Sequence, residues 1–302
     1  MFIDKPLLRL GQAVWQRSMP KDGSLPKGMC TMNKSVFALL LSGSGALTAL
    51  DMKPWFGDVY ACSCKGSFAY VGFPKVEGAQ VQLTAPAQSR TMTIDLNATP
   101  FSYCDVQIEG EFGHTRCVNW ALRSAALQLR LRPLNDIAGD PCSLVMGLSV
   151  RAAPTHFLKD VSTPYAAQCN LELTTSVGKE LSLGAHWTLR TYGFLALGQA
   201  NRGYPWIRPI WVGEYKWHNR HQFTLFVESH IGCGGKQGVD VHRFNGWGHF
   251  QHQSIDVGGG YGLKMGVWGT ASVFYARRVF AHNFPMQANS FIASYSIPFS
   301  VL

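Results

Sequence analysis

Apolar and polar residues alternate with a period of two along residues 180–230. The alternation occupies three consecutive segments, which are separated by a polar stretch at 198–203 and by a turn-like stretch at 218–220. Each segment is apolar on one parity and mostly polar or charged on the other. A period of two predicts β-strands with two chemically different faces. The side chains that we expect on the apolar face include Leu181, Leu183, Trp187, Leu189, Trp211, Tyr215 and Trp217.

Two architectures contain such strands, and composition separates them. A soluble β-sandwich buries the apolar face, whereas a transmembrane β-barrel turns it toward lipid and turns the polar face toward a lumen. Charged residues make up 15% of the chain and aromatic residues 12%, whereas soluble domains usually contain roughly 25% charged residues. Beyond residue 50 no run of 18 apolar residues occurs, so a helical membrane protein is excluded. Composition therefore favours an all-β, antiparallel transmembrane β-barrel that forms one domain over residues 50–302.

Further alternating stretches complete the predicted barrel wall. They extend from residue 59 almost to the C-terminus and give about twelve strands, although ten or fourteen also fit. Near Ser124 the apolar parity changes phase, which predicts a β-bulge. The expected connections alternate between the two ends of the barrel and so form two sets. The longest loops fall in the second set. Outer-membrane barrels have short periplasmic turns and longer external loops, so we expect the second set to be external. The first set is 97–100, 133–141, 178–179, 218–220 and 265–266, and the second is 74–77, 113–114, 153–165, 198–204, 232–249 and 281–287.

The N-terminal region reads as a targeting segment. Residues 32–34 form a short basic region, and residues 35–50 form an apolar core with small residues near Ala49. This pattern predicts a secretory signal peptide over 32–49, cleaved near Ala49. Residues 1–31 would then be an upstream extension assigned by mistake, with Met32 as the true start. The alternative is a buried strand or helix at 36–50.

The signal peptide, the alternating strands and the terminal strand together resemble Gram-negative outer-membrane β-barrel proteins. In that family the assembly machinery recognises the closing strand by alternating apolar residues and a terminal aromatic residue. Tyr295, Ile297 and Phe299 fit this pattern, whereas Leu302 replaces the terminal aromatic residue. The resemblance implies a location in the outer membrane of a Gram-negative bacterium, contact with outer-membrane lipid, and recognition by the barrel-assembly machinery through the C-terminal strand.

Seven cysteines follow the predicted start. They are Cys62, Cys64, Cys104, Cys117, Cys142, Cys169 and Cys233. An odd number in an oxidising envelope leaves one thiol free or paired with another protein, so disulfide-linked envelope proteins are candidate partners. Cys62 and Cys64 form the one close pair and are the candidates for a disulfide, whereas small apolar packing residues are the alternative interpretation. Because cysteine-bearing barrels of this family are typical of chlamydiae, an uncharacterised chlamydial barrel is a narrower match.

The polar parity of the strands predicts a lumen wall of mixed charge. The pattern places six basic and five acidic side chains in this wall, so we expect weak ion selectivity. Arg190 and Arg208 are the candidates for a local anion-attracting cluster, because the predicted strands place both toward the loop at 198–204. The side chains predicted to line the pore are Glu109, Glu111, Arg130, Arg132, Glu172, His186, Arg190, Arg208, Glu214, Lys216, Glu228 and Lys264.

Other chemistry receives less support from the sequence. The formal net charge is +9, but residues 1–49 hold six basic and two acidic residues, which leaves 21 basic against 16 acidic residues elsewhere. No basic cluster interleaves with aromatic residues, so we expect no nucleic-acid partner. The histidine pairs 218/221 and 249/252 have a spacing of three, which on a strand points them to opposite faces, so no metal or cofactor is predicted. His252, Ser254 and Asp256 share a parity but spread over about 13 Å, too far for a catalytic triad on one strand.

The sequence therefore favours a porin-like passive channel for small hydrophilic solutes. Diffusion through a water-filled lumen, filtered by size and by wall charge, would be the mechanism. Two alternatives remain open. One is an outer-membrane lipid or acyl hydrolase, and the other is a disulfide-linked structural or adhesin-like envelope barrel.

Overall fold

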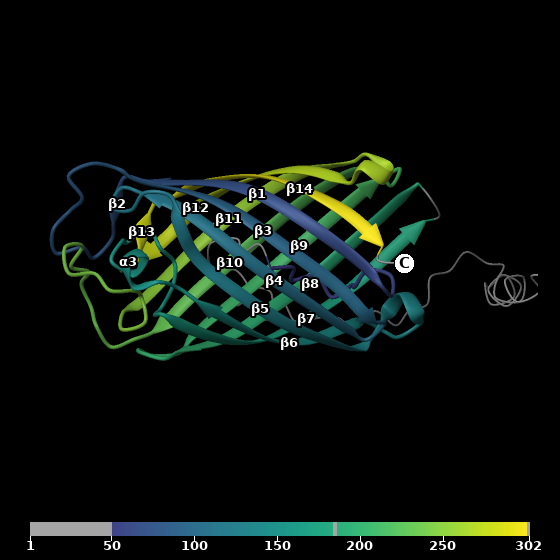
Figure 1. Cartoon of the computed structure of the whole chain (residues 1–302), viewed down its shortest axis with the longest axis horizontal. Helices are drawn as coiled ribbons and strands as arrows, with labels where there is room; N and C mark the ends of the chain where they lie inside the picture. The colour runs from purple at the N-terminus through teal and green to yellow at the C-terminus, as the bar shows by residue number, and fades with distance from the viewer. Residues whose placement is uncertain (1–49, 184–185, 301–302) are drawn as a thin grey trace, which may run out of the picture. The chain divides into compact units, whose positions relative to one another are not determined.

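The computed structural model describes residues 50–183 and 186–300, and the predicted extension and signal peptide lie outside these residues. The described residues form a closed antiparallel barrel of twelve strands, in the order β1-β14-β12-β11-β10-β9-β8-β7-β6-β5-β4-β3 (Figure 1). The strands are β1 Ala61–Phe73, β3 Ala87–Phe101, β4 Cys104–Thr115, β5 Ala121–Leu134, β6 Ser143–Ala152, β7 Cys169–Leu183, β8 Trp187–Ala200, β9 Trp206–Trp217, β10 His221–Cys233, β11 Gln251–Lys264, β12 Thr270–His282 and β14 Asn289–Ser300.

Short elements lie between the strands of the wall. A two-stranded sheet pairs β2 (Lys75–Val76) with β13 (Pro285–Met286). One helical turn, α3 (Thr155–Leu158), and two 3₁₀ turns, η2 (Asp136–Ala138) and η3 (Gly266–Trp268), occupy connections. None of the helices among the described residues is long and apolar enough to span a membrane, a finding that concerns helices only.

The connections differ in length at the two ends of the barrel. We call the end where β1 begins and β14 ends the terminal end, and the opposite end the loop end. The three longest connections, 74–86, 153–168 and 234–250, all lie at the loop end (Figure 1). The sequence predicted long loops for the second and third of them, whereas the first is longer than the predicted 74–77. They pack together through a buried apolar cluster that includes Phe73, Val76, Phe244, Trp247 and Phe284.

Several predicted turns are wrong, because strands continue through them. Residues 97–100 belong to β3, and the pairing between β3 and β4 becomes irregular after Ala98, so Pro100 removes no regular ladder bond. The connection expected at 113–114 begins after Thr115. The strand expected over residues 80–96 begins only at Ala87.

Gly178 and Lys179, predicted as a turn, lie inside β7, and the turn follows Leu183. The stretch 180–190 is therefore a hairpin rather than one strand. Leu181 pairs with Leu189 across this hairpin, so both keep the same parity. Gly178 has a different role, because a Cβ atom there would lie 2.7 Å from Pro54 Cγ and 2.8 Å from Tyr192 Cβ. The glycine makes room for a chain segment inside the barrel.

The predicted β-bulge near Ser124 is confirmed. Glu111 pairs with Ser124 and Phe112 with Leu122, so Arg123 is the additional residue in β5. The bulge turns Arg123 inward, where its Nη1 atom donates to Thr91 Oγ1 at 2.5 Å and to Ser89 Oγ at 3.3 Å. Beyond the bulge, Leu127, Leu129 and Leu131 return to the outer face.

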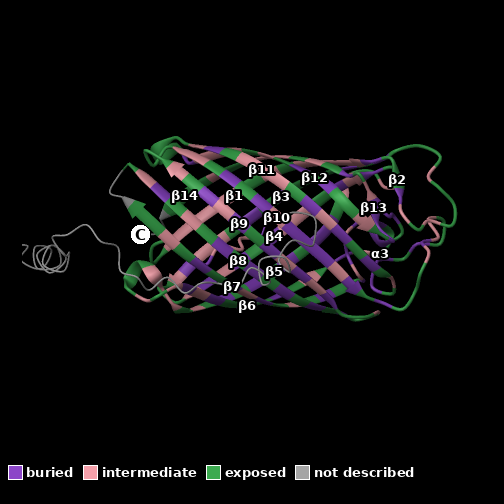
Figure 2. Ribbon diagram, turned by 180° about the vertical axis from the view of Figure 1, so that it is seen from behind, coloured by how far each residue is buried: buried purple, intermediate pink, exposed green. Residues whose placement is uncertain are grey.

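The outer face of the wall is apolar. Exposed and buried residues alternate along the strands, as the bands in Figure 2 show. The exposed positions include Ile108, Leu127 and Val150, which are neighbours in register on β4, β5 and β6. Trp211, Tyr215 and Trp217 are exposed on β9, as the sequence predicted. This alternation places a continuous apolar surface outside a polar interior, as in transmembrane β-barrels.

If the outer face contacts lipid, we expect Leu127→Arg to destabilise the barrel by about 2 to 4 kcal/mol, because an arginine near the middle of a lipid-facing wall must leave water. Reversible unfolding by guanidinium in liposomes measures this change. Ala138→Arg, in the exposed turn η2, is the matched control and should leave the free energy of unfolding nearly unchanged. Equal stability of both variants and the unaltered protein would mean that this face does not contact lipid.

Candidate functional site

Pairs of opposite charge line the inside of the barrel. Arg130 donates from Nε and Nη2 to Asp105 Oδ1, at 3.0 and 2.9 Å. Arg278 binds both carboxylate oxygens of Asp256, each at 3.0 Å. Burying an unpaired charge is costly, so such pairing is what keeps charged side chains stable inside the wall. Three further pairs are Arg151 with Glu109 at 2.5 Å, Arg190 with Glu180 at 2.5 Å, and Arg208 with Glu172 at 2.7 Å.

Most of the side chains predicted for the lumen lie inside the wall. Their charges compensate one another locally, and the pairs join neighbouring or next-neighbouring strands. That they line a conducting path stays a prediction. The residues that are buried or half-buried are Glu109, Glu111, Arg130, Arg132, Glu172, Arg190, Arg208, Glu214, Lys216 and Glu228.

Three predicted lumen residues lie near the rim of the terminal end, where two of them are exposed and Arg132 lies 4.9 Å from the centre of the Phe56 ring. His186 is exposed in the turn between β7 and β8, and Lys264 is exposed as the last residue of β11. Arg132 is half-buried near the end of β5 and donates to the carbonyl oxygen of Ser102 at 2.6 Å. The alternation of apolar and polar residues continues past the points at which these strands meet their turns. The sequence alone therefore assigns residues beyond those points to the lumen wall.

The predicted cluster of Arg190 and Arg208 does not form. Arg190 pairs in register with Glu214 near the terminal end of the barrel, whereas Arg208 is opposite Ala196 near the loop end. Each guanidinium also has its own carboxylate partner, Glu180 and Glu172 respectively. The connection between β8 and β9 pairs Gly198 with Trp206, and this register separates Arg190 from Arg208 along the wall although their strands are adjacent.

A chain segment inside the barrel was not predicted. We call residues 50–56 the luminal segment. Its backbone is held by polar side chains of the wall, since the Asp51 N–H donates to Gln107 Oε1 at 2.9 Å and Ser176 donates to the Met52 carbonyl at 2.7 Å. Arg130 Nη1 donates to the carbonyl oxygens of Asp51 and Lys53, at 2.8 and 3.1 Å. Strands β4, β5 and β7 thus bind the segment directly.

Side chains of the luminal segment add specific anchors. Lys53 Nζ lies 2.8 Å from Glu214 Oε1, and Glu214 is almost fully buried. Trp55 packs edge-on against Tyr192, and the Arg190 guanidinium lies 4.9 Å from the centre of the Trp55 ring. The segment therefore fills the part of the lumen next to β8 and β9.

Asp136, in the turn η2, fastens the segment at the terminal end. The Trp55 indole N–H donates to Asp136 Oδ1 at 2.8 Å, the Glu180 backbone N–H donates to Oδ2 at 2.6 Å, and the Ser143 hydroxyl also donates to Oδ1. Partial burial alone would raise the pKa of the Asp136 carboxyl, but these hydrogen bonds lower that pKa below its usual value. The anchor is therefore retained at neutral pH and is lost only as the pH falls through the lowered pKa.

A cavity of about 480 Å³ remains beside the luminal segment. Along β1 its lining runs from Ser63 to Phe73, and along β12 from Thr270 to Arg278, so it extends over most of the height of the wall. Small hydroxyl side chains of three adjacent strands form one side. We call this side the serine wall, and it consists of Ser63, Ser67, Ser272, Ser290, Ser294 and Ser296.

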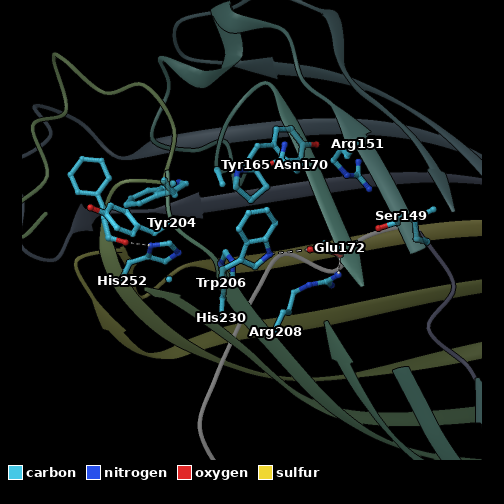
Figure 3. A pocket seen from close by; sticks show the side chains of 17 residues that line it. Ser149, Arg151, Tyr165, Asn170, Glu172, Tyr204, Trp206, Arg208, His230 and His252 are labelled. Carbon is cyan, nitrogen blue, oxygen red and sulfur yellow. Dashed lines mark hydrogen bonds and ion pairs between the residues drawn. The ribbon is translucent and has the colours of Figure 1, made fainter. Parts of the chain in front are cut away.

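A smaller cavity, of about 70 Å³, lies under the loops. Figure 3 shows Trp206 donating its indole N–H to Glu172, at 3.1 Å, beside Arg208 and the two histidines 230 and 252. The described residues contain no group of three or more His, Cys, Asp or Glu that could hold a metal ion.

His252 does not join Ser254 and Asp256 in a catalytic relay. Its Nδ1 atom lies 3.1 Å from the Phe250 carbonyl oxygen, which fixes the proton on Nδ1. Asp256 directs both oxygens to Arg278 and so does not orient the histidine. The arrangement gives the hydrolase interpretation no support at these three residues.

All seven cysteines from Cys62 onward are free thiols. Cys62 and Cys64, the candidate pair, share one face of β1 and are not bonded to each other. Cys117, Cys169 and Cys233 are exposed at the loop end.

A closed antiparallel ladder with an apolar outer face and paired charges inside defines an all-β barrel of the outer-membrane type. No protein-family model and no curated protein matches the sequence. Among solved structures, the chain is similar to the COG4313 outer membrane channel from Pseudomonas putida F1, with 10% identity and a TM-score of 0.63 over 83% of this chain and 100% of that chain.

Two further solved structures are similar at lower scores. The translocator domain of the autotransporter NalP from Neisseria meningitidis is 11% identical, with a TM-score of 0.45 over 80% of this chain and 89% of its own. The NanC porin is 8% identical, with a TM-score of 0.47 over 78% of this chain and 98% of its own. At these identities the likeness concerns the fold, and it does not bear on a chlamydial origin.

We expect Lys53→Met to loosen the luminal segment, because the buried carboxylate of Glu214 then loses its positively charged partner. A charge-assisted hydrogen bond contributes about 1.5 kcal/mol, so amide hydrogen exchange in a peptide covering residues 50–60 should become about tenfold faster. Lys53→Arg, which keeps the positive charge, is the control and should exchange close to the normal rate. Unchanged exchange in Lys53→Met would show that this ion pair does not hold the segment.

Proposed function

We propose that this protein is a passive channel for small hydrophilic solutes in the outer membrane of a Gram-negative bacterium. The observation that carries the proposal is the cavity that runs along the serine wall beside the luminal segment. A closed barrel pairs the backbone polar groups of its strands with one another, so side chains supply most of the polar groups that the strands present to the cavity. The hydroxyl side chains of the serine wall carry no net charge, and they can replace part of the hydration shell of a passing solute.

The lining of the cavity supports weak ion selectivity. It holds five basic side chains, Lys53, Lys65, Arg123, Arg151 and Arg278, and five acidic ones, Asp51, Asp95, Glu109, Glu111 and Glu214. Because the two signs balance, the wall offers no strong net potential to either cations or anions. Size is then the main filter, and the luminal segment sets the free cross-section.

The loop end adds a second restriction on passage. Phe73, Trp247 and Phe284 belong to the apolar cluster of the loops and also line the cavity where it meets this end. Solutes that enter from the loop end must therefore pass these connections. We infer a narrow channel of low conductance rather than a wide pore.

The channel is tested by single-channel recording of the refolded protein in planar bilayers. We expect small, weakly selective currents. Ser294→Phe places a ring in the serine wall and should lower the conductance, whereas Ala293→Phe adds the same ring to the outer face of the same strand and should not. Absence of current in the unaltered protein, or equal conductance of both variants, would contradict the proposal.

A disulfide-linked envelope barrel is the second candidate function. The observation that favours it is the group of exposed free thiols at the loop end, Cys117, Cys169 and Cys233. Thiols at the rim of one end can reach a neighbouring protein, whereas thiols inside a wall cannot. These cysteines do not exclude channel activity, so both roles can coexist.

We expect cell envelopes prepared with a thiol-blocking reagent to show this protein in cross-linked species on a non-reducing gel. Reduction should return the protein to its monomeric mobility. Replacing the three loop-end cysteines with serine should remove the cross-linked species, whereas Cys104→Ser, at the terminal end, should not. A single monomeric band without reductant would contradict the structural role.

A further inference from the structure

One side of the large cavity is apolar, although it lies inside the barrel. Phe226 on β10, Phe274 on β12 and Ile292 on β14 line it, together with Ile210 and Val212 on β9. These residues lie on the parity that faces inward, where a water-filled barrel usually carries polar side chains. We call the five residues the apolar wall.

Glycines on β11 create the space for the two phenylalanine rings. A Cβ atom on Gly258 would lie 2.3 Å from Phe226 Cζ, and one on Gly260 would lie 2.1 Å from Phe274 Cδ1. The rings therefore lie against the backbone of β11, the strand between their own strands. Any larger residue at these two positions would push the rings into the cavity.

The luminal segment covers only part of this apolar surface. Trp55 and Met52 pack in the buried cluster that contains Ile210, Val212 and Phe226, and Phe274 lies at the edge of the same cluster. Ile292 does not belong to it, yet it lines the cavity. Apolar surface thus continues past the segment toward β14 and faces the open space.

The opposite side of the cavity carries hydrogen-bonding groups that lack partners. Strands β3 and β4 lie across the ring of twelve strands from β9 and β10. Asp95 and Glu109 are neighbours in register on these two strands, and each is at most 3% exposed. Within the described part of the chain, Asp95 Oδ1, Glu109 Oε2 and Gln107 Nε2 are buried atoms without a hydrogen-bond partner.

Buried polar atoms in folded proteins nearly always have a hydrogen-bond partner, so these three atoms mark a place where a bound molecule would be held. Two of them are carboxylate oxygens, which accept hydrogen bonds. The molecule that satisfies them must present donors such as hydroxyl groups.

The charge around these atoms selects a neutral molecule. Asp95 is paired in register with Lys65 on β1, and Glu109 is bound by Arg151 at 2.5 Å. Each carboxylate therefore has a positive charge nearby, and an added ammonium or carboxylate group would lose its hydration without meeting a net opposite charge.

We propose that the cavity binds a neutral amphipathic molecule with a flat apolar body and hydroxyl groups at one edge. Its body lies on the apolar wall, and its hydroxyl groups donate to Asp95 and Glu109. The cavity volume of about 480 Å³ falls within the roughly 300 to 1,000 Å³ of typical ligand pockets. The inference deepens the proposed channel function, since it names the class of solute that the channel would select.

The test uses the full chain in lipid nanodiscs and three probes of the same shape. 2-Phenylethanol is neutral, 2-phenylethylamine is cationic and phenylacetate is anionic, and each carries its single polar group at one end of a flat apolar ring. Equilibrium dialysis against protein-loaded and empty nanodiscs separates binding to the cavity from partition into lipid. We expect the neutral probe to bind at least about tenfold more tightly than either charged probe, since desolvating an unpaired charge costs more than about 1.4 kcal/mol.

Two variants test the carboxylate side of the cavity and the apolar wall separately. Asp95→Asn removes the carboxylate beside Lys65, so the preference should shift from the neutral probe toward the anionic one. Phe274→Ala should weaken all three probes without changing their order. Val273→Ala, on the outer face of the same strand, should change nothing. A shift in preference reports on the cavity itself, because a general loss of folding would weaken every probe equally.

Equal binding of the three probes, or binding of glycerol as tight as that of the neutral aromatic probe, would overturn the proposal. An unchanged order of preference in Asp95→Asn would also overturn it. The outcome is independent of conductance. Currents without selective binding would contradict the proposed binding site but not the proposed channel. Selective binding without currents would contradict the channel but not the binding site.

Discussion

The hydrogen bonds between β1 and β14 close the ring on which the structure depends. They pair the first and last strands of the wall over twelve positions, from Ala61 with Ser300 to Gly72 with Asn289. Without this pairing, two strand edges would present backbone N–H and C=O groups to an apolar surrounding, where each unsatisfied group costs several kcal/mol. Closure pairs the backbone N–H and C=O groups of the strands with one another. The side chains therefore determine the chemistry of the two faces. The apolar outer face and the charged interior follow from that division.

The interior then has to accommodate charge in a confined volume. Arginine and carboxylate side chains meet across the strands, as Arg130 does with Asp105 and Arg278 with Asp256. This pairing stabilises the interior and cancels the net field. The luminal segment uses the same pairing, since Lys53 neutralises Glu214 and the backbone carbonyls of the segment accept from Arg130. What stays open is a space with a hydroxyl side, an apolar side and a balanced set of charges.

The sequence predicts the wall much better than the interior. The period of two marks the outer face directly, and the phase change at Ser124 locates the bulge at Arg123 to within one residue. Turn positions are harder to predict, because Gly178 looks like a turn residue although its small size serves a contact with Pro54. The inward apolar residues Phe226 and Phe274 fall on the parity that the pattern assigns to the polar side.

The luminal segment could not be predicted for a different reason. Residues 50–56 have no periodicity, and their partners are distant in sequence, with Gln107 56 residues from Asp51 and Ser176 124 residues from Met52. Single polar residues such as Asp136 carry no local signal that marks them as anchors. Only the closed barrel brings these scattered groups to one place.

The location of that segment also restricts the order in which the barrel assembles. Its hydrogen bonds and its lysine ion pair reach β4, β5, β7, β9 and the turn η2, and none of them reaches β14, which closes the ring. All of these contacts can therefore form on a curved, still open sheet. A ring that had already closed would instead have to admit Trp55 and its neighbours through one of its ends, past side chains that are already paired. Docking before closure avoids that passage, because the segment can then contact the sheet from its open edge before β14 completes the ring.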